Sequence, residues 1–272
     1  NARERNLTTV LKLIELCEID ENDSGETSPL DILMMDLEEE SPDSYAVKTY
    51  KKFRCAAGKT LKSILISVNA LIGVFDTPEL ESMLMIDTIS IPSIGQKPTA
   101  LFVVVSDTDR SMDVLANLFF TQAMNELCYY ADNHTKNNRL PVPVRFILDD
   151  FATNCQIAEF PRMISSIRSR DISAMLMIQA ESQLEKGYGP DEKTIIGNCD
   201  TYIYLGGNDV DTAKAVAVRC DVPVKKILNM PVGTNWIFRR GQAPVNGVNF
   251  ELEPFLESKG INKNTQNQEM IR

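Results

Sequence analysis

The segment Arg145-Phe146-Ile147-Leu148-Asp149-Asp150 decides how the second half of the chain is expected to fold. Its short apolar run predicts a buried strand, and two adjacent carboxylates follow that strand directly. In open α/β sheets, ligands bind at the carboxyl ends of the strands. Asp149 and Asp150 are therefore the first candidates for a functional site.

The surrounding sequence alternates short apolar runs with stretches of helical period. Strands are expected near 101–105, 144–148, 173–178, 201–205 and 235–238. Helices are expected near 112–131, 160–168 and 211–219, with a further helical stretch near Glu192. Leu101 to Val105 has the continuous apolar character of a parallel strand buried on both faces. This alternation predicts right-handed β-α-β units and an α/β fold, a parallel sheet with flanking helices.

The first part of the chain follows a helical pattern instead. Ser28-Pro29 and Thr77-Pro78 are typical helix starts, and one long helix is expected from about Ala46 to Phe75. We therefore expect an all-helical domain over 1–95, an α/β domain over 96–257 and a flexible tail over 258–272. The two domains are expected to join between about Thr88 and Pro98, where two prolines end the helical period.

A strand that ends in Asp149-Asp150 has the layout of a Walker B element, which holds the magnesium of a nucleotide and orients the attacking water. Magnesium keeps most of its waters and needs only one or two protein oxygens. Many strands end in acids for solubility, so this stretch by itself leaves both interpretations open.

Several further motifs follow in order, and together they resemble the TraG/TraD coupling proteins of type IV secretion and conjugation. The resemblance is strong over about 98–255 and looser over the helical part. The residues that carry it are Phe146 to Phe151 with Ala152, then Phe160, Ile167-Arg168-Ser169-Arg170, Ile178-Gln179-Ala180-Glu181-Ser182-Gln183-Leu184, Ile196-Gly197-Asn198-Cys199-Asp200 and Tyr204-Leu205-Gly206-Gly207.

The resemblance implies a RecA-like nucleotide-binding core and an all-helical domain implicated in substrate selection. Proteins of this family are hexameric ATPases anchored in the inner membrane, with cytosolic domains that pass DNA and protein substrates to a secretion channel. The implied cofactors are Mg and ATP in a longer parent protein. The implied partners are secretion substrates, relaxosome proteins, DNA and channel components, with membrane contact through an N-terminal anchor outside this chain.

The resemblance also implies roles for single residues. Asp149 is the magnesium-side acid, bound through water, and Asp150 occupies the place of the catalytic acid, where the family usually has glutamate. Gln179 takes the place of a γ-phosphate sensor, because an amide both donates and accepts hydrogen bonds. Arg168 matches a trans-acting arginine finger, with Arg170 as the alternate. A polar strand-end cap for Gln179 and a helix-end arginine bonding carbonyls for Arg168 stay open.

Gly58-Lys59-Thr60 imitates the end of a phosphate-binding P-loop, but the first glycine of that motif would have to stand where Phe53 is. We reject the motif, since it also falls inside a helical pattern. In the resembled family the P-loop lies upstream of the helical domain, that is, before Asn1. The fragment itself is therefore expected to bind no nucleotide and to hydrolyse no ATP.

The helical part separates its charges. Twelve acids and no bases lie between Glu15 and Ser44, and six bases and no acids lie between Lys48 and Lys62. A solvated face and a docking surface for a partner are both compatible with this pattern. The lysines expected on one helix face, and so the predicted partner-binding residues, are Lys48, Lys51, Lys52, Lys59 and Lys62.

Bulk properties exclude some classes of protein. A net charge of −10 argues against a surface that binds nucleic acid everywhere. Six scattered cysteines and the single His134 do not form a zinc motif, and no uninterrupted apolar run predicts a membrane span. Two alternatives to the motor remain: a non-catalytic recruiting module, and a related hexameric DNA-translocating ATPase.

Overall fold

The computed structural model describes residues 6–17, 27–56, 58–106, 108, 110–154 and 156–259. These residues form two compact units, divided between Ser90 and Ile91. The last 13 residues of the sequence lie outside the described part, so the predicted flexible tail is described only at its first two positions. Each unit is described by itself below.

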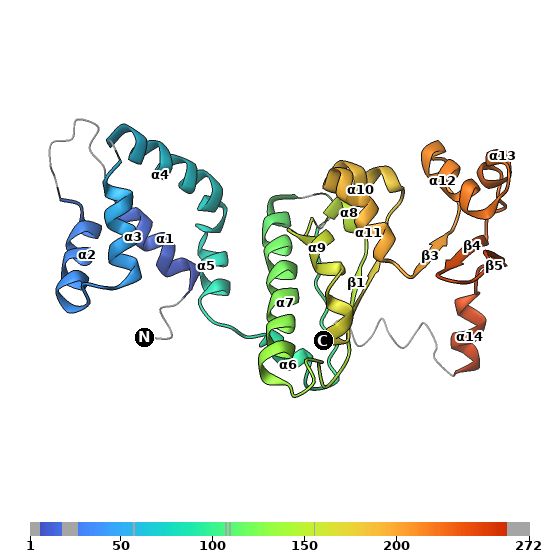
Figure 1. Ribbon diagram of the computed structural model, residues 1–272, viewed down its shortest axis with the longest axis horizontal. Helices are drawn as coiled ribbons and strands as arrows, with labels where there is room; N and C mark the ends of the chain where they lie inside the picture. Colours follow the sequence, from blue (N-terminus) through green and yellow to red (C-terminus); the bar gives the residue numbers. More distant parts are fainter. Residues whose placement is uncertain are drawn as a thin grey trace. The chain divides into compact units, whose positions relative to one another are not determined.

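In its described residues, the first unit contains helices and no strand (Figure 1). Its elements are α1 (Leu7–Glu15), α2 (Pro29–Glu40), α3 (Tyr45–Arg54), α4 (Gly58–Ile72), η2 (Gly73–Phe75) and α5 (Pro78–Leu84). Both helix starts expected from proline are confirmed. Ser28 and Asp31 form a capping box at α2, and Thr77 accepts a hydrogen bond from the Leu80 backbone N–H at α5.

The single long helix expected from Ala46 to Phe75 is wrong, because α3 and α4 are separate helices. The end of α3 carries three bases, Lys51, Lys52 and Arg54, which favour the carboxyl end of a helix dipole. Gly58 begins α4, and glycine is a poor residue for a helix interior. Local sequence therefore favours a break that the apolar periodicity did not reveal.

One helical stretch within the described ranges, Gly58–Phe75, is long and apolar enough to cross a membrane by length and composition alone. Its mean hydropathy is 1.3 and 11% of it is buried. Leu61 and Phe75 anchor it to the helical unit. This candidate membrane span was not predicted from the sequence, because Lys59 and Lys62 interrupt its apolar residues.

The second unit alternates helices and strands. Its elements are α6 (Ile91–Ile94), η3 (Arg110–Met112), α7 (Asp113–His134), β1 (Val144–Leu148), α8 (Phe151–Asn154), α9 (Phe160–Ile164), η4 (Ile167–Arg170), β2 (Ile172–Leu176), α10 (Glu181–Tyr188), η5 (Gly189–Asp191), α11 (Glu192–Asn198), β3 (Thr201–Tyr204), α12 (Val210–Cys220), α13 (Val224–Leu228), β4 (Thr234–Arg239), β5 (Val245–Val248) and α14 (Leu252–Ser258).

The strands of the described part form two sheets. β1 and β2 are parallel, with Leu148 opposite Leu176, whereas β3, β4 and β5 form an antiparallel sheet in that order. The prediction of parallel pairing throughout is therefore wrong for β3 and β4. Alternation with helices indicates how strands follow one another along the chain, but not which neighbour each strand pairs with.

Helices cover only one face of the β1–β2 pair. Met124 of α7 and Leu148 share a core with Phe151, Phe160 and other buried residues, whereas alternate side chains such as Ile147, 62% exposed, point outward. Figure 1 shows α7 running beside β1. A separate core joins α12 and α13 to the antiparallel sheet, with Tyr204 and Val216 among its buried members.

The strand predicted over Leu101–Val105 is wrong. These residues have no strand assignment and no ladder partner in the described part, and Phe102 and Val104 are 87% and 94% exposed. A strand needs a neighbouring strand for its backbone N–H and C=O groups, whatever its own side chains are. The apolar run alone could not provide that neighbour.

Candidate functional site

The parallel pairing of β1 and β2 places the chain segments that follow them at one edge of the sheet. Beyond the strands, Phe151 N–H donates to Met177 O and Met177 N–H donates to Leu148 O, both at 3.0 Å. Asp149, Asp150 and Gln179 are therefore held at the same carboxyl edge, as expected from their positions after the two strands.

Asp150 adopts a left-handed backbone conformation, with φ of 48°. Few residues other than glycine occupy this region at low cost, although aspartate tolerates it better than most. The Asp149 carboxylate accepts a hydrogen bond from Asp150 N–H at 3.1 Å. The tight turn leaves the Asp149 side chain exposed and that of Asp150 half-buried. Such local strain is often found at functional sites.

Gln179 and Asp150 are brought together by this geometry. Gln179 Nε2 lies 3.5 Å from Asp150 Oδ1, a long hydrogen bond, and Gln179 N–H donates to Gln183 Oε1 at 3.0 Å. The side chain of Gln179 is exposed. An amide at this place can donate to an anion or accept from water, so the contact is compatible with a sensor and with a polar cap.

The edge fits a magnesium ion that keeps most of its waters. Within the described ranges, no group of three or more His, Cys, Asp or Glu side chains could enclose a metal. Two adjacent carboxylates and an amide supply the oxygen ligands magnesium prefers, with room for water and phosphate oxygens. Asp149 is the residue that could hold it, through a water molecule, and Gln179 could contact a phosphate of the nucleotide.

Arg168 lies at the other edge of the parallel pair, since η4 precedes β2. A five-residue strand spans roughly 16 Å, which separates Arg168 from the acids within one chain. The side chain is 82% exposed and lies 3.5 Å from Asp200 Oδ2, while Arg240 Nε contacts the other oxygen of Asp200 at 3.0 Å. The structure therefore does not join Arg168 to Asp149.

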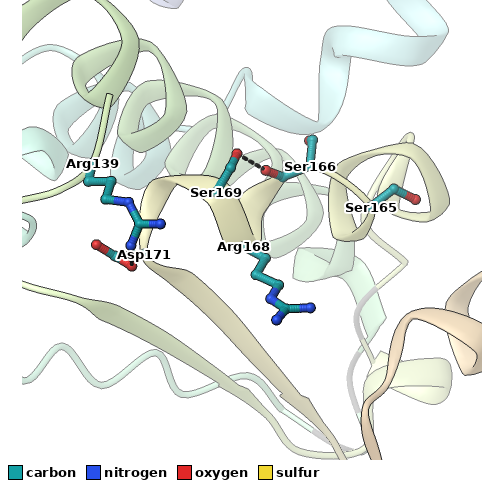
Figure 2. Close-up of a pocket in the computed structure, with 6 residues that line it drawn as sticks. All are labelled: Arg139, Ser165, Ser166, Arg168, Ser169 and Asp171. Carbon is teal, nitrogen blue, oxygen red and sulfur yellow. Dashed lines mark hydrogen bonds and ion pairs between the residues drawn. The ribbon is translucent and has the colours of Figure 1, made fainter. Parts of the chain in front are cut away.

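An open pocket of about 520 Å³ lies beside Arg168, lined by Arg139, Ser165, Ser166, Arg168, Ser169 and Asp171. Figure 2 shows the Arg168 side chain extending away from the Arg139–Asp171 ion pair, and Ser169 directed at the Ser166 carbonyl. All three serine hydroxyls donate to backbone carbonyls, so they are already engaged.

The alternate residue, Arg170, has a structural partner. Its guanidinium makes two contacts to Asp132, at 2.9 and 2.7 Å, and 23% of the side chain is exposed. The hydrogen bonds that Arg170 donates to the Asp132 carboxylate raise the pKa of Arg170 above its usual value. A bidentate pair fixes the side chain of Arg170 in place, whereas the side chain of Arg168 is the more exposed of the two.

A half-buried polar cluster next to Gln179 was missed from the sequence. Glu181 lies 3.3 Å from Arg219 Nη2, and the Arg219 guanidinium stacks 4.4 Å from the centre of the Tyr202 ring. Burial, followed by the nearby Glu181 carboxylate, raises the pKa of Tyr202. Glu181 N–H also donates to Thr212 Oγ1 at 3.0 Å. These contacts tie the loop after β2 to β3 and α12.

The five lysines of the predicted docking face are divided between two helices. Lys48 pairs with Asp43 at 2.8 Å and Lys51 pairs with Glu38, while Lys59 and Lys62 belong to α4. Part of the acidic segment therefore folds back onto the bases. Among the residues described, Lys52 and Lys59 form no ion pair. Gly58-Lys59-Thr60 begins a helix and follows another helix, which fits the rejection of a P-loop.

One known protein family matches the part of the chain that contains the candidate site. Residues 143–220 match the family model described as the TraM recognition site of TraD and TraG. The chain carries a TraG/TraD-type segment. No curated protein sequence matches the chain significantly. The matched segment begins just before β1 and ends with α12, so it contains Asp149, Asp150, Arg168 and Gln179.

Solved structures of a conjugative coupling protein share the fold. The unbound monoclinic form of the bacterial conjugative coupling protein TrwBdeltaN70 is 15% identical, with a TM-score of 0.58, and the match covers 72% of this chain and 51% of that one. TrwB with the ATP analogue ADPNP is 14% identical, with a TM-score of 0.60, and the match covers 89% of this chain and 57% of that one. TrwB with ADP and Mg2+ is 15% identical, with a TM-score of 0.55, and the match covers 79% of this chain and 57% of that one.

These matches show the fold: a RecA-like α/β unit together with an all-helical unit. The chain spans about half the length of the TrwB structures that it matches. The matched segment is thus similar to TraD and TraG, and the fold is similar to that of TrwB.

Proposed function

We propose that this chain is the cytosolic portion of a coupling protein that recruits DNA or protein substrates and drives their transfer into a secretion channel. The observation that carries the proposal is the meeting of Asp149, Asp150 and Gln179 at one sheet edge, within the TraG/TraD-type segment. In the parent protein this portion works at the cytoplasmic face of the inner membrane, with ATP and magnesium as cofactors.

Each site residue has a defined task in that proposal. Asp149 holds magnesium through a water molecule, Asp150 orients the attacking water, and Gln179 contacts the γ-phosphate. A bound nucleotide supplies the phosphoanhydride bond that is hydrolysed. Arg168 reaches the nucleotide of the adjacent subunit in a hexamer, since the sheet separates it from the acids of its own chain.

The partners follow from the same resemblance. The family description names a TraM recognition site, which supports a relaxosome protein of the TraM kind as a partner of the second unit. Secretion substrates, channel components and DNA in the hexamer are further proposed partners. The lysines of α3 and α4 remain a candidate face for an acidic partner. Lys52 and Lys59 are its main candidates, because Lys48 and Lys51 are neutralised by nearby acids.

Trans-complementation in the full-length parent tests the arginine assignment. We expect Asp149→Ala and Arg168→Ala each to lower ATP hydrolysis by about 10³-fold or more when tested singly. Mixed hexamers of the two variants should regain part of the activity, because an intact Arg168 can serve an intact Asp149 across the interface. Arg139→Ala, which changes the same pocket, is the matched control and should remain active.

Normal hydrolysis by the Asp149→Ala parent would overturn the assignment of Asp149 as the magnesium-side acid. A recruiting module without hydrolysis would instead show no ATPase activity in the parent with every residue intact. For the chain alone, titration with ATP–magnesium in a calorimeter should show no tight, saturable binding. Tight binding would contradict the rejection of Gly58-Lys59-Thr60 as part of a phosphate-binding loop.

A further inference from the structure

The outward side of α2 combines large apolar side chains with acids. Ile32, Leu33 and Met35 are 53%, 46% and 56% exposed. The opposite side of this helix contacts α3, through Asp31 with Tyr50 and through Glu38 with Lys51. α2 therefore has one side committed to its own unit and one apolar side open to solvent.

The charges of this side are all of one sign. α2 contains five acids and no base. Asp31 and Glu38 are engaged with α3, whereas Asp36, Glu39 and Glu40 are exposed and form no ion pair within the described part of the chain. The exposed apolar residues thus have three acidic neighbours and no basic residue on the same helix.

The position of these acids is unfavourable in the isolated unit. The last turn of α2 carries three consecutive glutamates and no basic residue, although the carboxyl end of a helix dipole repels negative charge. α3 shows the favourable arrangement, with three bases in its last turn. Lys51 relieves this repulsion at Glu38, and a cationic partner would relieve it at Glu39 and Glu40, which form no ion pair within the described part of the chain.

The sign of the charge selects the occupant. Phosphates of nucleic acid and anionic lipid headgroups are repelled by Asp36, Glu39 and Glu40. A segment with apolar residues on one side and Lys or Arg beside them matches both the exposed apolar residues and the acids. Met35 adds an adaptable contact, since methionine packs against side chains of varied shape.

We propose that the outward side of α2 is a docking face for a basic amphipathic segment of a partner protein. That this partner is a secretion substrate or relaxosome protein rests on the proposed function; the docking chemistry does not. The face is separate from the lysines of α3 and α4 and from the carboxylate edge of the second unit.

A synthetic amphipathic Lys/Leu peptide with a fluorophore tests the proposal by anisotropy, with the intact chain and no nucleotide. We expect saturable binding that weakens as salt rises. The pair Ile32→Ser and Met35→Ser should weaken binding by about tenfold, and so should the pair Asp36→Lys and Glu39→Lys. A peptide with Glu in place of Lys should not bind.

Two matched controls separate docking from general attraction to an acidic protein. Ile66→Ser removes an apolar side chain of α4 that is 62% exposed, and Asp76→Lys with Glu79→Lys changes the net charge equally, elsewhere in the same unit. Both should bind the peptide like the original chain. Equal losses in the controls and in the α2 variants, or binding of the acidic peptide, would overturn the proposal.

Circular dichroism of every variant checks that the helical unit remains folded. Because the assay contains no ATP, its outcome is independent of the nucleotide experiments above. Absence of peptide docking together with an active parent ATPase would contradict the α2 proposal alone. An inactive parent together with intact docking would contradict the motor proposal and leave the α2 proposal standing.

Discussion

At the scale of single residues, Asp31 joins the start of α2 to α3 through both of its carboxylate oxygens. Oδ2 accepts hydrogen bonds from Ser28 N–H and Oγ–H at 2.9 and 2.8 Å, while Oδ1 accepts from the Tyr50 hydroxyl at 2.9 Å and lies 3.0 Å from Arg54 Nε. Burial acts to raise the pKa of Asp31, but the hydrogen bonds and the arginine together lower it. Burial and Asp31 raise the pKa of Tyr50 to about 12.

This arrangement predicts an acid-sensitive helical unit. Because the pKa of Asp31 is lower when folded, its stabilising effect is present above about pH 4 and is lost as the pH falls through the folded-state value. Asp31→Asn should lower the free energy of unfolding by about 1–3 kcal/mol at neutral pH. Urea titrations followed by circular dichroism should show the gap from the original chain closing below pH 4.

A gap that stays constant from neutral to acidic pH would show that the carboxylate charge is not the stabilising feature. Asp36→Asn, an exposed acid on the same helix, is the control, and it should change stability little at any pH.

At the scale of elements, the segment 101–105 differs most from its predicted form. Its side chains favour a strand, yet the described part of the chain supplies no strand to pair with it. Extended, exposed and unpaired backbone is what proteases cleave most readily. It is also a site where chains associate edge to edge.

Limited chymotrypsin digestion should therefore cut first after Leu101 or Phe102. Tyr129 is 60% exposed but lies within the 22-residue helix α7, so it should resist for longer. Mass spectrometry of the early fragments identifies the cut. A first cut at Tyr129, or protection of 101–105, would mean that the segment pairs with another strand in solution.

At the scale of the whole molecule, two units with separate cores are expected to unfold separately. Trp236 is the single tryptophan of the sequence and lies in the second unit, so its fluorescence reports that unit alone. Leu61, 3% exposed, belongs to the first unit. A mutation in one core should leave the other transition unchanged, since distant sites act additively.

Leu61→Ala should destabilise the helical unit by about 2–5 kcal/mol and shift the helix signal in circular dichroism, without moving the Trp236 midpoint. Leu148→Ala, also 3% exposed, is the reciprocal change and should lower the stability of the second unit. Parallel shifts of both signals in either variant would show one cooperative unit in place of two.

The sequence alone determined the local features. Apolar runs and turn residues located β1, β2, β3 and β4, and proline with serine or threonine located the starts of α2 and α5. It also placed Asp149 and Asp150 directly after one strand and Gln179 at the end of the next, at the carboxyl ends of strands, where ligands bind. These features depend on neighbouring residues and on one general rule of chain topology.

Only the tertiary structure decided which surfaces and charges remain uncompensated. It pairs β3 with β4 antiparallel and leaves 101–105 without a strand partner among the described residues. It also places Arg168 at the opposite edge from the acids, and neutralises Lys48 and Lys51 while leaving Asp36 and Glu39 exposed. The physical reason is that strand pairing, burial and ion pairs join residues far apart in the chain. Periodicity along the sequence carries no information on which distant partner each residue meets.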